Sequence, residues 1–133
     1  MGLVAFTDEK SKTHRAQAAY YSGDVNATIT LIAALGAGLK IRVLRYKLCV
    51  NGESNAFAHV YFQSVGSNVQ ISGTNFLGLG VGNAPGISGN YAKCGHFETA
   101  ANEGLGIVFS SGSGTVGIDL TYSVEPIDSA YTP

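Results

Sequence analysis

Residues 115–125, Thr-Val-Gly-Ile-Asp-Leu-Thr-Tyr-Ser-Val-Glu, carry the clearest structural pattern in this chain of 133 residues. Every second residue from Val116 to Val124 is apolar, and the residues between them are small or polar. Because successive side chains of a strand point to opposite faces of a sheet, this alternation predicts a half-buried antiparallel strand. Pro126 has no amide proton to donate, so we expect the strand to end there.

Further short runs of apolar and β-branched residues, separated by turn residues, predict the rest of a sheet structure. We expect strands at residues 28–32, 40–50, 56–65 and 105–109, with a shorter one at 69–72. The glycine-rich residues 73–95 are predicted to be mostly loop, and residues 110–114 to form a flexible hairpin. This pattern favours an all-β protein, an antiparallel β-sandwich of jelly-roll-like type with six to eight strands.

The first part of the chain lacks both a helical and a strand period, and we expect an extended N-terminal arm at residues 1–24. The β-sandwich domain then spans residues 25–133. One domain of this length buries enough surface to fold without disulfides or metal ions. The candidate contact residues of the arm are basic or aromatic: His14, Arg15, Tyr20 and Tyr21.

The apolar pattern of residues 40–50 changes phase near Val43 and Leu44. One extra residue at this point, a β-bulge, would restore a continuous inward face. Four basic side chains would then point outward together, and we call them the basic ridge: Lys40, Arg42, Arg45 and Lys47. Such a ridge suits either an acidic partner surface or a solvated face whose charges oppose aggregation.

The strand expected at residues 56–65 has two apolar sides. Small and branched residues with one phenylalanine occupy the first side: Ala58, Val60 and Phe62. The second side, which we call the aromatic face, contains Phe57, His59 and Tyr61. Because an aromatic surface of this kind is rarely left in water, we expect another subunit or a loop to cover it.

The composition excludes several classes of function. A net charge of −1 gives the whole chain no affinity for nucleic acid, and no apolar run approaches the length of a membrane helix. The N-terminus also lacks the basic residues of a signal peptide. Cys49 and Cys94 are expected to be free thiols in a reducing compartment, although the sequence does not decide whether they pair.

No arrangement of residues in the sequence points to catalysis, a cofactor or a metal ion. The glycine-rich residues 78–86 are not followed by a predicted helix, which phosphate-binding loops require. His14, His59 and His96 do not share metal-ligand spacing with one another or with the cysteines. We therefore expect a protein without enzyme activity, cofactor or metal site.

From Asp24 onward the chain resembles a class of small virion proteins of tailed bacteriophages. The resemblance is carried by residues 40–44 (Lys-Ile-Arg-Val-Leu), 58–62 (Ala-His-Val-Tyr-Phe) and 96–105 (His-Phe-Glu-Thr-Ala-Ala-Asn-Glu-Gly-Leu), and by the closing strand to Glu125. His96 stands where these proteins usually have an aromatic residue, and Asn102 stands where glycine is common.

The resemblance is to capsid decoration, or cement, proteins with a jelly-roll fold, which often form homotrimers. It implies a structural virion protein that binds the outside of a phage head and stabilises contacts between major capsid protein subunits. The expected location is the capsid surface of the virion, after assembly in the host cytoplasm, without nucleic-acid or membrane partners. The candidate capsid contacts are the four arm residues and the basic ridge, and the candidate subunit interface is the aromatic face.

Similar sandwiches also occur in head fibres and tail adhesins, so the fold alone does not decide the role. The alternative hypothesis is therefore a head-fibre or tail adhesin module that binds a host-surface glycan. Its candidate loop, residues 83–91, offers Asn90 and Tyr91, although the chain contains no tryptophan. The sequence leaves open the phage and host, the oligomeric state, the capsid attachment site and any bound glycan.

Overall fold

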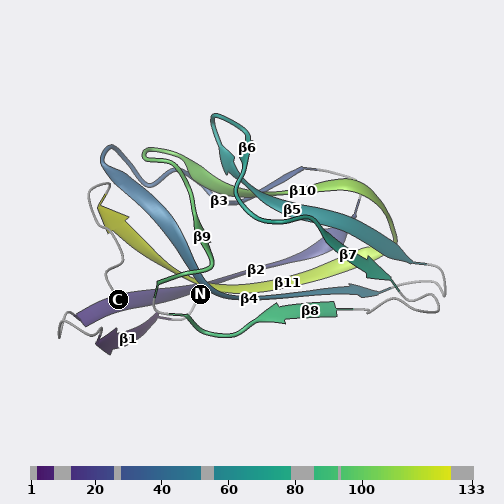
Figure 1. Cartoon of the computed structure of the whole chain (residues 1–133), viewed down its shortest axis with the longest axis horizontal. Coiled ribbons are helices and arrows are strands. Elements are labelled where there is room, and N and C mark those ends of the chain that lie inside the picture. Colours follow the sequence, from purple (N-terminus) through teal and green to yellow (C-terminus); the bar gives the residue numbers. More distant parts are fainter. Residues whose placement is uncertain are drawn as a thin grey trace.

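The computed structural model describes residues 3–7, 13–25, 28–51, 56–78, 86–92 and 94–126. In this part of the chain, two antiparallel sheets pack face to face as a β-sandwich (Figure 1). The predicted all-β sandwich is therefore confirmed. The described residues form eleven strands where six to eight were predicted, because several short strands lie in stretches without a strand pattern.

The two sheets share the strands as follows. The six-stranded sheet contains, in order, β1 (Leu3–Thr7), β2 (Thr13–Asp24), β11 (Thr115–Pro126), β4 (Leu39–Asn51) and β8 (Gly86–Gly89), and β9 (Phe97–Glu98) also pairs with β4. The five-stranded sheet contains β3 (Ile29–Ile32), β10 (Gly104–Ser113), β5 (Phe57–Val65) and β6 (Val69–Gln70), and β7 (Asn75–Gly78) also pairs with β5.

The strand pairings have the nested order of a jelly roll. Strand β2 pairs with β11, β3 with β10, β4 with β8, and β5 with β7. The first half of the chain thus pairs with the second half in reverse order, as in a long hairpin that is rolled into two layers.

Strand β11 lies between β2 and β4 in the six-stranded sheet. Its inward residues Val116, Ile118 and Leu120 are buried, as the alternation predicts. The register also confirms the predicted bulge, because Thr121 lies opposite Arg45 while the next residue of β11 lies opposite Val43. Leu44 is therefore the extra residue of β4.

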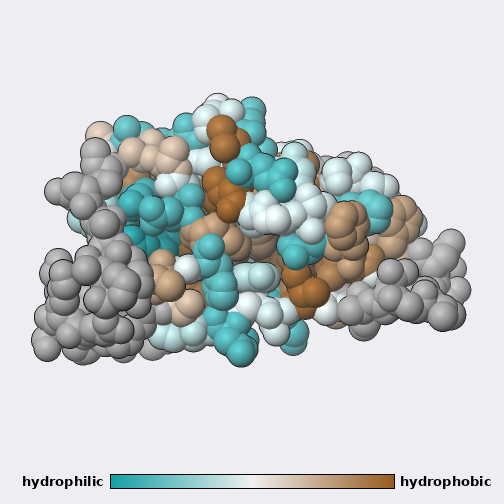
Figure 2. Space-filling model, viewed as in Figure 1, coloured by the Kyte–Doolittle hydropathy of each residue, from teal (hydrophilic) through white to brown (hydrophobic). Residues whose placement is uncertain are grey.

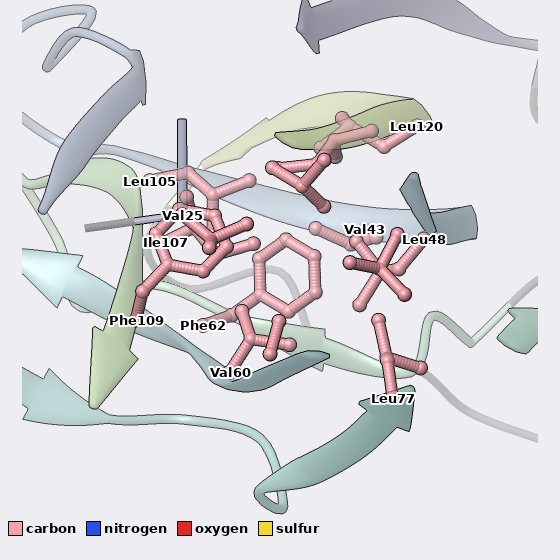
Figure 3. Packing of buried hydrophobic residues seen from close by; sticks show 14 of the residues in the cluster. Val25, Val43, Leu48, Val60, Phe62, Leu77, Leu105, Ile107, Phe109 and Leu120 are labelled. Carbon is pink, nitrogen blue, oxygen red and sulfur yellow. The ribbon is translucent and has the colours of Figure 1, made fainter. Parts of the chain in front are cut away.

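The core lies between the two sheets and is centred on Phe62, whose side chain is fully buried. Figure 3 shows the Phe62 ring enclosed by aliphatic side chains from both layers. The labelled neighbours include Val43, Leu48 and Leu120 from the six-stranded sheet and Val60, Leu105 and Ile107 from the five-stranded sheet. Close packing of this kind fixes how one layer sits on the other.

The segment between β9 and β10 ties the two sheets together. The Thr99 hydroxyl accepts a hydrogen bond from the Ile41 N–H at 3.0 Å, and the Thr99 N–H donates to the Ile41 carbonyl at 2.9 Å. The Ser64 hydroxyl donates to the Glu103 carboxylate at 2.6 Å and accepts from the Ala100 N–H at 2.9 Å. This segment therefore bonds to β4 in one layer and to β5 in the other.

The structure differs from the predicted arm at residues 13–24. These residues form β2, which pairs with β11 from Ala16 to Asp24. The inward side of β2 includes Ala19 and Tyr21, which pack against the core. Because small and polar residues occupy much of this side, the sequence of β2 shows no apolar alternation. The strand is instead stabilised by its pairing with the central strand β11. Residues 3–7 of the predicted arm form β1, which pairs with β2, and residues 1–2 and 8–12 lie outside the described residues.

Two further stretches differ from the prediction. Residues 73–95 were expected to be mostly loop, yet they contain the edge strands β7 and β8. Gly89 of β8 lies opposite Tyr46, and a Cβ atom at Gly89 would overlap the Tyr46 ring. Glycine therefore allows a tertiary contact here that strand propensity does not report. Residues 79–85 and 93 lie outside the described residues.

Residues 110–114 do not form the predicted hairpin. Strand β10 continues to Ser113, and β11 begins at Thr115 in the other sheet. Gly114 turns the chain between the layers with a φ of 103°, a backbone conformation that favours glycine.

Candidate functional site

The structure places Arg45 and Lys47 of the basic ridge on the same surface as Tyr20 of the predicted arm. On the outer side of the six-stranded sheet, Asp119 lies between Tyr20 of β2 and Lys47 of β4, and Arg45 lies opposite Thr121. All but Thr121 are exposed, and Tyr20 is 77% exposed. We call this surface the charged face, defined by Tyr20, Arg45, Lys47 and Asp119.

The other half of the basic ridge is neutralised by carboxylates. The Arg42 guanidinium is 3.1 Å from Glu98 and 3.5 Å from Glu125, and the Lys40 ammonium is 2.8 Å from Glu98. Arg42 is only 4% exposed and Glu125 only 5% exposed. Arg42 points to the predicted side of the sheet, but it is buried within an ion-pair cluster and is not an accessible contact residue.

The ion pairs change the acidity of Glu98. Burial raises the pKa of its carboxyl group, but hydrogen bonds and charges from Lys40 and Arg42 outweigh burial and lower the pKa below its usual value. Glu98 therefore stays ionised at neutral pH and compensates the charge of two ridge residues.

The remaining arm residues have different environments. Tyr21 points to the opposite side of β2 from Tyr20 and packs against the core, so the two tyrosines predicted as contact residues do not lie on the same surface. The two side chains diverge because adjacent residues of a strand face opposite sides of the sheet. The side chains of His14 and Arg15 lie outside the described part of the chain.

The aromatic face lies on the outer side of the five-stranded sheet and is larger than predicted. The ring centroids of Phe57 and His59 are 5.5 Å apart, and those of His59 and Phe76 are 4.8 Å apart. Phe76, from β7, lies opposite His59 and is 64% exposed. The sequence did not reveal this contribution, because Phe76 and Leu77 are adjacent apolar residues without a strand alternation and lie within the stretch expected to be loop.

A groove of about 470 Å³ lies between the edges of the two sheets. One side is lined by Tyr46 of β4 together with His96 and Phe97, and the other by Gln70, Ser72 and Asn75 near β6 and β7. Figure 2 shows hydrophobic and hydrophilic surface lying close together on the side of the molecule where β6 and β7 lie. The sequence did not identify this groove, because its residues come from segments that meet only in the folded chain.

Of the two residues proposed for glycan binding, Asn90 lies beside this groove, because its carbonyl contacts His96. Asn90 and Tyr91 are both exposed, and burial of part of the Tyr91 ring raises the pKa of its hydroxyl group. The Asn90 carbonyl is 2.6 Å from Nε2 of His96. Since a carbonyl oxygen only accepts, Nε2 carries the proton in this bond. The first part of the candidate loop, residues 83–85, lies outside the described residues.

The described residues contain no group of three or more His, Cys, Asp or Glu side chains placed to hold a metal ion. Cys49 and Cys94 are exposed free thiols. Among the same residues, no helix has the length and hydropathy needed to cross a membrane.

No protein-family model and no curated protein matches the chain. Among solved structures, the chain is similar to one in the cyanophage Pam1 capsid asymmetric unit, with 16% identity and a TM-score of 0.49 over 81% of this chain and 84% of that chain. It is also similar to the CBM22-1 xylan-binding domain of Xyn10C from Paenibacillus barcinonensis, with 10% identity and a TM-score of 0.35 over 96% of this chain and 81% of that chain. Both TM-scores are below 0.5, so these similarities are weak.

Proposed function

We propose that the chain is a structural virion protein, without enzyme activity, that binds the outside of a phage head and stabilises contacts between major capsid protein subunits. The observation that carries the proposal is the jelly-roll order of the strands together with two different outer surfaces. This architecture is the one that the resemblance to decoration proteins implies. Such a protein acts by adding contact area between capsid subunits. A rigid sandwich can supply this area without a reactive centre.

The aromatic face is the proposed subunit interface of a homotrimer. Its side chains carry no fixed charge, so copies of the face can meet without opposing like charges. Aromatic residues are also the ones enriched in the buried centres of interfaces. Self-association would remove the exposed Phe76 ring from water.

The charged face is the proposed contact with the major capsid protein. Because it lies on the opposite side of the sandwich from the aromatic face, it stays accessible when the aromatic face is covered. Arg45 and Lys47 provide positive charge for an acidic capsid surface, and Tyr20 provides an exposed aromatic group that can be buried on binding.

Each contact between a protomer and the capsid is modest, but several contacts made by one trimer together stabilise the head. When one protomer of a trimer binds, the others bind as tethered ligands at a high effective concentration. The trimer would thereby connect neighbouring capsid subunits and oppose their separation. Localisation on the capsid surface follows from the same contacts.

Binding to heads tests the capsid contact. The probe is purified heads of the phage that encodes the chain, prepared without this protein, and the readout is saturable co-sedimentation. We expect the wild-type chain to bind and the double variant Arg45→Glu, Lys47→Glu to bind at least about tenfold more weakly, since two charge contacts become repulsive. Thr30→Ala, on the exposed side of β3, is the control and should bind like the wild type. Failure of the wild-type chain to bind would overturn the proposal.

A further inference from the structure

The groove between the edges of the two sheets has the chemistry of a ligand site that is separate from both proposed protein contacts. We propose that it binds a neutral saccharide. The part of its lining that the structure describes contains no Asp, Glu, Lys or Arg side chain, so it offers no counter-ion to an acidic sugar. Its volume of about 470 Å³ lies within the ordinary range for small-molecule sites, roughly 300–1,000 Å³.

One side of the groove is a rigid aromatic wall. The ring centroid of Tyr46 is 5.1 Å from that of His96 and 5.7 Å from that of Phe97. Buried Phe62 supports both Tyr46 and Phe97, with centroid separations of 5.9 Å and 4.8 Å. Because the rings hold one another in place, little side-chain entropy is lost when a ligand packs against them. The C–H groups of a sugar ring suit such a wall.

The other side of the groove presents polar groups in fixed positions. The Gln70 amide NH₂ donates to the Ser72 carbonyl at 2.7 Å, and the Asn75 NH₂ donates to the Gly73 carbonyl at 3.5 Å. Gln70 also donates to the Thr74 hydroxyl at 3.3 Å. These bonds orient the two amides and use both N–H groups of Gln70 and one N–H group of Asn75. The amide oxygens of Gln70 and Asn75 then serve as acceptors for ligand hydroxyl groups.

His96 adds a further acceptor to the aromatic wall. Its Nε2–H donates to the Asn90 carbonyl, and in this tautomer Nδ1 is the acceptor. An aromatic wall facing fixed acceptors selects a ligand that has apolar C–H groups on one side and hydroxyl donors on the other. Neutral saccharides have this distribution, whereas purely apolar ligands would leave the acceptors unpaired.

Isothermal titration calorimetry with the full chain tests the site. The neutral probes are maltohexaose, cellohexaose, xylohexaose and mannohexaose, and the acidic probes are sialyllactose and a heparin hexasaccharide. We expect at least one neutral probe to bind and the acidic probes not to bind. Gln70→Ala combined with Asn75→Ala should weaken the neutral ligand about tenfold, the loss expected for two hydrogen bonds.

Val69→Ala is the matched control, because Val69 is the exposed neighbour of Gln70 and is not part of the groove. This variant should bind the neutral probe like the wild type, and circular dichroism should show that both variants keep the sheet structure. The proposal is overturned if no neutral probe binds, if an acidic probe binds more tightly, or if the double variant binds like the wild type. Because no phage heads enter this assay, its outcome is independent of the capsid-binding result.

Discussion

At the scale of single residues, Arg42 shows that position in a strand does not settle the role of a basic side chain. Its guanidinium lies between Glu98 and Glu125 and is almost fully buried. A buried cation is costly unless carboxylates compensate it, so the three groups must be kept together. Arg42 is therefore structural, while Arg45 and Lys47 of the same strand remain available to a partner.

Replacing Arg42 should destabilise the fold. Arg42→Ala leaves Glu125, which is 5% exposed, without its guanidinium neighbour. We expect the free energy of unfolding in urea to fall by about 3 kcal/mol, the usual cost of removing one member of a buried pair. Lys47→Ala, at an exposed position of the same strand, should change it by no more than about 0.5 kcal/mol. Equal effects of the two substitutions would contradict a structural role for Arg42.

Stability should decline in acid through Glu103 and Glu98. Hydrogen bonds from the Ser64 hydroxyl and from the Ser67 hydroxyl and N–H lower the pKa of Glu103, and Lys40 and Arg42 lower that of Glu98 despite burial. The ordinary pKa is 4.5 for both groups. A lowered pKa in the folded state means that the unfolded chain takes up protons first as the pH falls. The stabilisation is thus complete well above pH 4.5 and is lost as the pH drops through the lowered values.

Urea unfolding at neutral pH and in mild acid measures this dependence. The wild-type chain should become less stable below about pH 4.5. Glu103→Gln should show a shallower decline, because the amide does not titrate. A variant with the same pH dependence as the wild type would mean that Glu103 does not contribute to the acid sensitivity.

At the scale of strands, close backbone approach explains why some glycines are required. A Cβ atom at Gly104 would overlap the Ile32 carbonyl oxygen, so an alanine there would push β10 away from β3. Gly104→Ala should cost about 1–3 kcal/mol of unfolding free energy. At Gly117 a Cβ atom meets nothing within 4 Å, and Gly117→Ala should be neutral or stabilise by up to about 1 kcal/mol. Thermal unfolding of both variants gives the comparison, and a Gly104 variant as stable as the Gly117 variant would contradict the close packing.

Strand β7 should govern self-association through Phe76. We expect the wild-type chain to be larger than a monomer in multi-angle light scattering, and Phe76→Ser to shift it toward the monomer because an aromatic anchor is lost. Val69→Ser is the control, since Val69 is also exposed, at 55%, but lies on β6. A monomeric wild-type chain, or equal shifts in both variants, would remove the aromatic face as the interface.

The strands that could be predicted from the sequence are those whose own residues carry the pattern. The alternation in β11 and the phase change at Leu44 of β4 were sufficient to predict a central strand and a bulge. Strands β2 and β8 were not predicted, because they contain alanine, glycine and polar residues without an apolar alternation. They form strands through pairing, β2 with β11 and β8 with β4. The candidate surfaces show the same limit: the sequence placed Arg42 on the correct side but could not reveal the carboxylates that reach it from β9 and β11.

At the scale of the whole molecule, the nested strand order determines which surfaces exist. Rolling the paired chain into two layers places the charged face and the aromatic face on opposite outer sides. It also brings Tyr46 of β4 and Phe97 of β9 close to the segment between β6 and β7, which creates the groove. None of these surfaces is formed by one continuous segment, so each depends on the complete fold.

Imaging the virion of the phage that encodes the chain, by electron cryomicroscopy, tests the central claim most directly. The account predicts sandwich-shaped density on the outside of the head, at the seams between capsomers, with protomers joined through the aromatic face and the charged face against the capsid protein. Density for this chain only on the tail or on fibres, or its absence from the virion, would contradict the account.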